Sequence, residues 1–239
     1  MPGEKKSEIA SVWTRPRRQR EQLSREQIVA EAVRLLDADG IEALSMRKLG
    51  TRLDAGATSL YRHVANKDEL IELVVDEVYG ELAVPAATGA ADWREAAARS
   101  AHSLRAMILR HPWVASVLGQ VGLIHLGPNV TKMSQRMAAV YDAAGFPADE
   151  TEQALSTVIS YVIGMATSEA AYLSLIARSG KTEREFAESL PAGTTGSAGT
   201  ADAGDVRVGG PQRAREETFD YGLQRVLDGL AVRLGPVGG

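Results

Sequence analysis

The side chains best suited to read a DNA duplex gather in one short stretch, residues 45–67. Its sequence, SMRKLGTRLDAGATSLYRHVANK, is typical of a short helix, a tight turn and a second helix. The outer face of the second helix carries a hydroxyl, a phenol, a guanidinium and an imidazole, on Ser59, Tyr61, Arg62 and His63. Such groups hydrogen-bond base edges and phosphates when a helix presents them to a groove. The stretch therefore predicts a helix-turn-helix reader of DNA.

A helix before this reader is marked at both ends. Ser24 and Gln27 have the spacing of a capping box, and Gly40 is the residue type that commonly ends a helix. We therefore expect a helix over residues 24–39, and Ser45 then caps the first reader helix. The apolar side chains expected to pack beneath the reader are Ile28, Ala32, Leu35 and Leu36.

The rest of the expected head follows in order along the chain. A turn over residues 54–56 joins the two reader helices, the second of which should span residues 57–64. Asn66 and Glu69 then have the spacing of a second capping box. They predict a linking helix that continues until Pro85 halts it.

Charge is divided unevenly between the two parts of the chain. The net charge is −4, but residues 1–67 hold 13 Lys and Arg against 9 Asp and Glu, whereas residues 68–239 hold 14 against 22. A basic head on an acidic body can approach phosphates with one face. Residues 1–22 are basic with few apolar anchors, which predicts a disordered arm that either solubilises the chain or touches DNA.

The composition favours an all-α protein and excludes several chemistries. Apolar residues recur every three or four positions and Ala is abundant. There is no Cys, which excludes disulfides, thiol nucleophiles and Cys-based zinc sites. The sequence contains no phosphate-binding loop, zinc-protease motif or nucleophile elbow. We therefore expect a protein that is not an enzyme and needs no metal or cofactor. Without a signal peptide or a long uninterrupted apolar run, it should be cytoplasmic and should not bind a membrane.

Two runs within this region, DADGIEALSMRKL and SLYRHVANKDEL, resemble the TetR (tetracycline-repressor) family of bacterial transcription regulators. The resemblance covers residues 24–82 closely. It departs from the family at the turn, where Asp54-Ala55 replaces the usual Gly-Val. Because Asp tolerates a positive φ better than most residues, we expect the turn to survive. Two later runs, ILRHPWVASVLG and FDYGLQRVLDGL, resemble the ligand-binding domain of the tetracycline-repressor branch itself.

The resemblance implies a role for each exposed residue of the reader. Arg47 matches the position that can reach guanine, and Ser59 or Arg62 can hydrogen-bond other base edges. Two alternatives stay open. Tyr61 could be a half-buried packing residue, and Arg62 could be an exposed side chain that contacts only solvent. Lys48 is expected to be a general surface cation. The family's base-reading positions are matched by Ala57, Thr58 and Ser59, and its phosphate-contacting positions by Tyr61, His63 and Lys67.

Helical spacing continues through the rest of the chain. We expect a DNA-binding domain over residues 23–84 and a helical domain for ligand binding and dimerisation over residues 85–239. The second domain should contain a mobile loop at residues 191–212, which are rich in Gly, Ala and Thr. Its helices are expected over residues 92–110, 113–118, 129–144, 149–178, 182–190 and 213–234, with Gly119, Gly145 and Pro112 among the interruptions.

Large adaptable apolar side chains suggest a ligand pocket in this second domain. Ordinary core packing is the alternative explanation for each of them. His102, His111 and His125 could orient a ligand. Tetracycline with magnesium is not the expected ligand, because the run His125-Leu126-Gly127 is followed by Pro128 where the tetracycline repressor has Thr. The candidate lining residues are Met107, Trp113, Met133, Met137, Tyr161 and Met165.

The helices expected over residues 149–178 and 213–234 have more apolar surface than one subunit needs. They predict a homodimer joined by a four-helix interface, although both stripes could instead be internal core. The leading hypothesis is a repressor that binds a palindromic operator as a homodimer and is released by a small apolar molecule. The alternative is a helical small-molecule-binding or partner protein without operator-specific DNA binding.

Overall fold

The fold is a small helical head joined to a larger helical body. This computed structural model describes residues 23–87, 89, 91–121, 127–189 and 206–234, and all regular structure in these ranges is helical, as the sequence predicted. The basic arm expected at residues 1–22 lies outside the described residues. The head contains α1 (Arg25–Asp39), a 3₁₀ turn (Ile41–Ala43), α2 (Met46–Arg52) and α3 (Ala57–Leu60).

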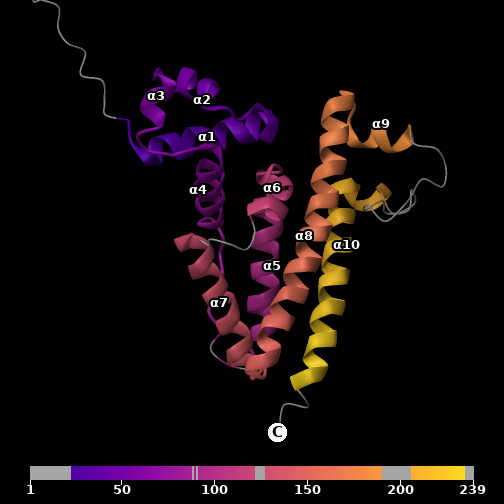
Figure 1. The fold of residues 1–239 in the computed structure, drawn as a ribbon. Coiled ribbons are helices and arrows are strands. Elements are labelled where there is room, and N and C mark those ends of the chain that lie inside the picture. The colour runs from indigo at the N-terminus through magenta and orange to yellow at the C-terminus, as the bar shows by residue number, and fades with distance from the viewer. Residues whose placement is uncertain (1–22, 88, 90, 122–126, 190–205, 235–239) are drawn as a thin grey trace, which may run out of the picture.

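One helix leads from the head into the body, which is built from α5 to α10 in the described part of the chain (Figure 1). The linking helix, α4, runs alongside α6 and α7, while α8 and α10 lie side by side on the opposite flank. The bounds are α4 (Lys67–Tyr79), α5 (Trp93–Arg110), α6 (Val114–Val121), α7 (Pro128–Ala144), α8 (Ala148–Ser179), α9 (Glu183–Glu188) and α10 (Val206–Ala231), followed by a 3₁₀ turn (Val232–Leu234).

The head folds from local signals that the sequence carries plainly. The hydroxyl of Ser24 accepts the backbone N–H of Gln27 at 3.2 Å, and the Gln27 side chain accepts the N–H of Ser24 at 3.0 Å, so the expected capping box is present. Gly40 ends α1 with a φ of 75°. The expected apolar stripe of α1 is completely buried: Ile28, Ala32, Leu35 and Leu36.

Helix α4 differs from its expected form at both ends. Asn66 caps it by accepting the N–H of Glu69, but the Glu69 carboxylate accepts from Ala65 and not from Asn66, so the second capping box is incomplete. The helix ends at Tyr79, well before Pro85. Gly80 follows directly at the C-cap position with a φ of −62°, and the low helix propensity of glycine favours an end there.

Three further expected helix bounds were wrong. The second reader helix, expected over residues 57–64, is regular only over α3 and then continues as turns. Helix α6 passes through Gly119, which a helix tolerates at a modest cost. Helix α10 begins at Val206 inside the expected loop, and the rest of that loop, up to residue 205, lies outside the described residues. Gly210, with a φ of 78°, kinks α10 just before the expected start at residue 213.

One continuous apolar core extends from the head into the body, where α5 lies at its centre. Helix α5 packs against α8 and α7, and α10 packs on α8. Helices α8 and α10 approach closely at Gly222, where any added Cβ would overlap the Tyr161 phenol. The core side chains that α8 and α10 contribute include Val158, Val162, Ala166, Phe219, Leu223 and Leu227.

A buried network of charges ties four body helices together. Arg105 on α5 makes two hydrogen bonds of 2.8 Å to Glu169 on α8. Arg215 on α10 donates to the same carboxylate at 3.0 Å and also pairs with Glu183 on α9. The Arg105 guanidinium lies over the Phe219 ring, 4.9 Å from its centroid. Such buried charges are tolerable because each has an opposite partner.

The end of the body distant from the head holds an aromatic cluster of Trp93, Tyr141 and Phe146. The Trp93 and Phe146 ring centroids are 5.4 Å apart, edge to face, and both rings contact Tyr141. Tyr141 is 1% exposed, and its hydroxyl has no hydrogen-bond partner within the described part of the chain. Burial raises the pKa of this phenol, because the charged form would lose its hydration.

We expect Tyr141→Phe to raise the free energy of unfolding by about 1 kcal/mol, because it removes a buried polar group that lacks a partner. Tyr161→Phe is the matched control. The Tyr161 hydroxyl donates to the Phe219 carbonyl at 2.8 Å, so its removal should lower stability by about 1 kcal/mol. Chemical denaturation of both variants measures the difference, and a destabilised Tyr141→Phe would contradict the assignment.

Candidate nucleic-acid interface

The reader is a helix-turn-helix held together by backbone contacts. Asp54 adopts a φ of 48° in the turn, so the substitution of Asp for the usual glycine is accommodated as expected. The N–H of Ala55 donates to the carbonyl of Gly50 at 2.9 Å. A Cβ at Gly50 would lie 2.8 Å from the Ala55 carbonyl oxygen, which is backbone and cannot move aside cheaply. Gly50 therefore sets how closely α2 and α3 pack, a role that sequence reasoning missed.

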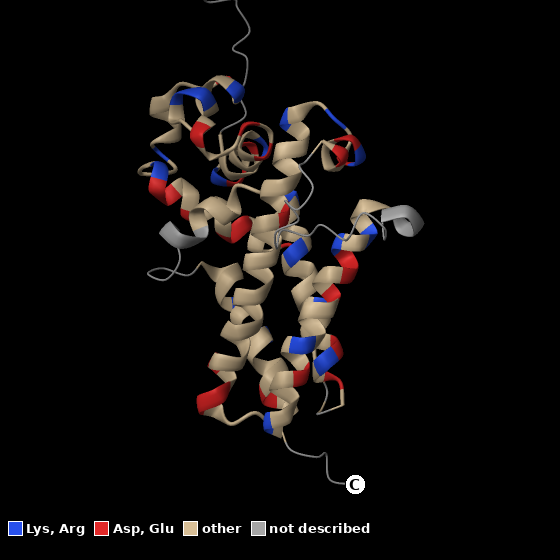
Figure 2. Ribbon diagram, turned by 90° about the vertical axis from the view of Figure 1, so that its right-hand side faces the viewer, with Lys and Arg blue, Asp and Glu red and all other residues tan. Residues whose placement is uncertain are grey.

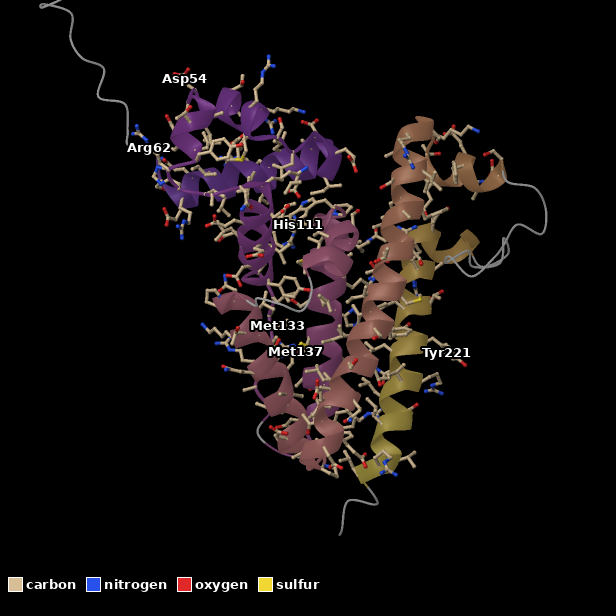
Figure 3. All side chains as sticks on the ribbon, viewed as in Figure 1. Asp54, Arg62, His111, Met133, Met137 and Tyr221 are labelled. Atoms are coloured by element: carbon tan, nitrogen blue, oxygen red, sulfur yellow. The ribbon has the colours of Figure 1, made fainter. Side chains whose placement is uncertain are left out.

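The structure brings the sequence-predicted DNA-binding residues to one end of the head. Figure 2 shows positions of Lys and Arg in blue on the ribbon of this end, and Figure 3 shows Arg62 and Asp54 at its tip. Tyr61 is 51% exposed, so it is not a half-buried packing residue. The exposed members of the predicted set are Arg47, Lys48, Thr58, Ser59, Tyr61, Arg62 and Lys67, whereas Ala57 and His63 are half-buried.

Two of the cationic side chains near the reader form contacts with other residues of the head. Lys48 pairs with Asp39 through Nζ at 3.0 Å, which suits its expected role as a general surface cation. Arg25, which the sequence analysis did not single out, donates from Nε to the His63 carbonyl at 3.2 Å. Arg25 thereby braces the segment after α3 from the first residue of α1. Only the folded arrangement brings these two positions together, since 38 residues separate them.

A groove of about 890 Å³ runs along the same end of the head. Its walls come from α1, the turn and α3, with Arg34 and Arg62 among the polar side chains and Leu23 and Leu53 among the apolar ones. Ser59 and His63 also line it. The groove therefore belongs to the reader surface and is separate from the ligand pocket expected in the body.

The residues proposed to line that ligand pocket lie in three different settings. Met107 and Trp113 are part of the continuous core, and Trp113 also donates from its indole nitrogen to Asp37 of α1 at 2.8 Å. Met133 and Met137 are buried on α7, on the side that faces α5, but outside that continuous core (Figure 3). Tyr161 is hydrogen-bonded to α10, and Met165 is half-buried one turn further along α8. Of the six residues proposed to line the pocket, Met133 and Met137 are thus the two that do not pack in or against the continuous core.

Two of the three histidines considered as ligand-orienting groups have carboxylate partners instead. His102 lies 2.9 Å from Asp220, and His111 lies 2.7 Å from Asp37 and 3.2 Å from Glu81. The third, His125, lies outside the described residues. Among the residues that the structure describes, no group of three or more His, Asp or Glu side chains could hold a metal ion.

Family models match most of the chain. Residues 28–74 match the model of "Bacterial regulatory proteins, tetR family", and residues 84–234 match that of the "Tetracyclin repressor-like, C-terminal domain". An HTH-type transcriptional regulator of Saccharopolyspora erythraea is 35% identical over 231 residues, which are 94% of this chain and 93% of that protein. The HTH-type transcriptional repressor DrrR1 of Streptomyces coeruleorubidus is 32% identical over 217 residues, covering 88% of this chain and 78% of DrrR1.

Two similar solved structures contain a ligand or DNA. The TetR family protein ActR of Streptomyces coelicolor, in complex with actinorhodin, superposes with a TM-score of 0.66 at 30% identity, covering 89% of this chain and 99% of that one. BioQ with its natural double-stranded DNA operator superposes with a TM-score of 0.61 at 26% identity, covering 88% and 99%. The helical head and body described above are therefore shared with proteins solved in both functional states.

The close packing at Gly50 leads to a test of the reader. Gly50→Ala should lower the free energy of unfolding by about 1–3 kcal/mol, because the new Cβ overlaps the Ala55 backbone. Gly56→Ala is the matched control, since it has open space at its Cβ and an ordinary φ of −71°. Thermal melting compares the two variants, and equal melting temperatures would show that Gly50 is not a packing constraint.

Proposed function

Because this chain belongs to the tetR family of bacterial regulatory proteins, it is a DNA-binding transcription regulator, and we propose a specific mode of action for it. It binds a palindromic operator as a homodimer, represses transcription there, and is released when a small apolar molecule binds the body. DrrR1 is named as a repressor, and ActR is known with a bound small molecule.

One observation carries the DNA-binding part of the proposal. The guanidinium groups of Arg47 and Arg62 and the phenol of Tyr61 are exposed together on α2 and on α3 with the turn that follows it. An Arg at the edge of a recognition unit suits the paired acceptors of guanine, and a phenol suits a phosphate oxygen. The BioQ operator complex supports the use of this same fold in DNA binding.

The ligand-binding part of the proposal is supported by α7. Met133 and Met137 are buried but do not belong to the continuous core, so a ligand could contact them without first displacing that core. Methionine is flexible and polarizable, which suits a site that must adapt to an apolar molecule. We therefore place the ligand between α5 and α7, with Met107 on the facing helix.

The homodimer is supported by the apolar face that α8 and α10 leave uncovered. Helix α8 is long and apolar enough to cross a membrane, yet only 28% of its most apolar window is buried within one subunit. Leu175 on α8 is 49% exposed and Tyr221 on α10 is 71% exposed, and Figure 3 shows Tyr221 pointing away from the body. A second copy pairing α8 and α10 with their equivalents would cover this face and explain its composition without a membrane.

The sequence alternative, that both stripes are internal core, is true for part of each helix. The buried members are Phe219, Leu223 and Leu227 on α10 and Val158, Val162, Ala166 and Ala170 on α8. The remaining members of the two stripes are half-buried, and these are the side chains that a second copy would cover: Leu155, Ile159, Leu173, Val226, Leu230 and Leu234.

Operator binding is tested by gel-shift titration against duplex from the promoter region of the chain's own gene, at two salt concentrations. Specific binding survives salt that removes nonspecific binding, so a complex that disappears at the higher salt would favour a helical binder without operator specificity. Arg47→Ala and Tyr61→Ala should each weaken operator binding by about 10-fold or more, while the melting temperature stays unchanged, because both side chains are exposed.

Arg136→Ala is the matched control for Arg47→Ala. Arg136 is an exposed cation on α7, in the body, so its loss changes the net charge equally without touching the reader. We expect operator affinity to stay within about twofold of the unchanged protein. Equal weakening by Arg47→Ala and Arg136→Ala would mean that total charge, and not the reader, governs binding.

The homodimer is tested by placing a charge on the uncovered face. The double variant Leu175→Glu, Tyr221→Glu should dissociate to monomers, because each copy would bury two carboxylates without partners. Light scattering coupled to gel filtration gives the mass. Ala139→Glu, at an exposed position on α7, is the control and should remain dimeric. A double variant that remains dimeric would place the interface elsewhere.

A further inference from the structure

Helix α7 begins without a cap of its own. Its N-cap residue is Gly127, which has no side chain, and Pro128 occupies the first helical position. The next two backbone N–H groups, of Asn129 and Val130, both donate to Oδ1 of Asp76, at 2.9 and 3.0 Å. An N-cap side chain normally makes this contact from within its own helix. Here a carboxylate on α4 makes it for a helix that begins about fifty residues later in the chain.

The contact is built closely on both sides. The Asn129 side chain donates from Nδ2 to the backbone carbonyl of Asp76 at 3.1 Å, so the two residues are joined twice. A Cβ at Gly127 would overlap the Asp76 carboxylate. Glycine is therefore needed at residue 127 for steric reasons, since its φ of −67° is ordinary.

The cap makes the first turn of α7 depend on where α4 lies. Two N–H groups at a helix N-terminus, together with the helix dipole, attract a carboxylate strongly. Hydrogen bonds of this kind weaken steeply once the donor and acceptor separate, so a shift of α4 of about 1 Å would remove both. The first turn of α7 would then have two backbone N–H groups without acceptors.

Asp76 also lies between the two regions that the regulator must connect. Helix α4 begins at Lys67, directly after the reader segment that ends with Val64. On α7, Met133 and Met137 follow Val130 by one and two turns. The cap is thus a direct polar contact between the linking helix and the helix proposed to contact the ligand.

We propose that Asp76 is the positioning residue that couples ligand binding on α7 to the position of α4 and the head. A ligand that displaces the first turn of α7 releases Asp76, which frees α4 to move; an operator that holds both heads in place keeps α4 fixed and strengthens the cap. Linkage requires the coupling to act equally in both directions. This inference rests on the proposed function, and it assigns the coupling to a named pair of hydrogen bonds.

Hydrogen exchange followed by mass spectrometry on the full-length protein tests the coupling without knowledge of the ligand. Operator duplex should slow exchange of the α7 first-turn amides in the unchanged protein by roughly 2- to 30-fold, the range expected for a helix cap. In Asp76→Ala the duplex should cause no change there. Asp76→Asn, which keeps an acceptor oxygen without the charge, should give an intermediate effect. Glu77→Gln, at an exposed neighbouring position on α4, should behave as the unchanged protein.

A second measurement, made without DNA, separates coupling from a purely local cap. Gly127→Ala displaces the carboxylate by steric overlap and leaves Asp76 in the sequence. If the bond couples the helices, this variant should speed exchange both in the first turn of α7 and in residues 74–79 of α4. Faster exchange in α7 alone would reduce Asp76 to a local cap and overturn the proposal.

The outcomes distinguish this inference from the proposed function. If the unchanged protein binds no duplex in the gel shift, the proposed function fails, and the DNA-free measurement still decides whether α4 and α7 are coupled. If the protein binds operator but its α7 exchange does not respond, or responds equally in Asp76→Ala, the coupling by Asp76 is wrong while the proposed function stands. Circular dichroism verifies that each variant is folded.

Discussion

The carboxylate of Asp37, near the end of α1, makes polar contacts that join the head to the body. One of its oxygens accepts the Trp113 indole N–H at 2.8 Å and lies 2.7 Å from a ring nitrogen of His111. The other ring nitrogen of His111 lies 3.2 Å from Glu81, just beyond the end of α4. Because His111 is 3% exposed, moving the head away would leave one nitrogen of this buried ring without its Asp37 partner.

The body is unevenly built, and this decides where movement is possible. On one flank, the paired charges of Arg105, Glu169, Arg215 and Glu183 join α5, α8, α9 and α10. Removing the Glu169 carboxylate would leave the buried Arg105 guanidinium without this opposite charge. On the other flank, α4 and α7 are joined by the Asp76 cap, which lies at helix ends and involves a single carboxylate. A ligand between α5 and α7 would therefore displace α7 at lower cost than α8, and the face proposed for dimerisation would stay in place.

The features that could be predicted from the sequence depend on residues close together in the chain. The Ser24 capping box, the positive φ of Asp54 and the end of α7 at Gly145 each involve at most a few neighbours, and all three were predicted correctly. The exposure of the reader also followed from helical spacing, while the roles of its residues came from resemblance to a family.

What could not be predicted depends on pairs that only the fold brings together. Asp76 and Asn129 are 53 residues apart, and nothing in either local pattern names the other. The carboxylate partners of His102 and His111 were missed for the same reason, and so was the packing of Tyr161 against Gly222 on α10. Gly50 was overlooked because a glycine within a short helix gives no sign of what approaches it.

The shortness of α3 shows why α1 matters as much as the reader itself. A regular segment of four residues, Ala57–Leu60, cannot be stable alone, because forming the first helical turn is unfavourable. Its order must come from neighbours: from buried Leu60 and Val64 beneath it, and from Arg25, which binds the segment that follows. Arg25 is the first residue of α1, whereas Asp37 lies near its last, about 18 Å away along the helix at 1.5 Å per residue. Helix α1 thus connects the body junction to the reader, and α4 provides a second connection. Two connections of this kind constrain the orientation of the head more tightly than one would, because a single connection leaves rotation about its own axis free.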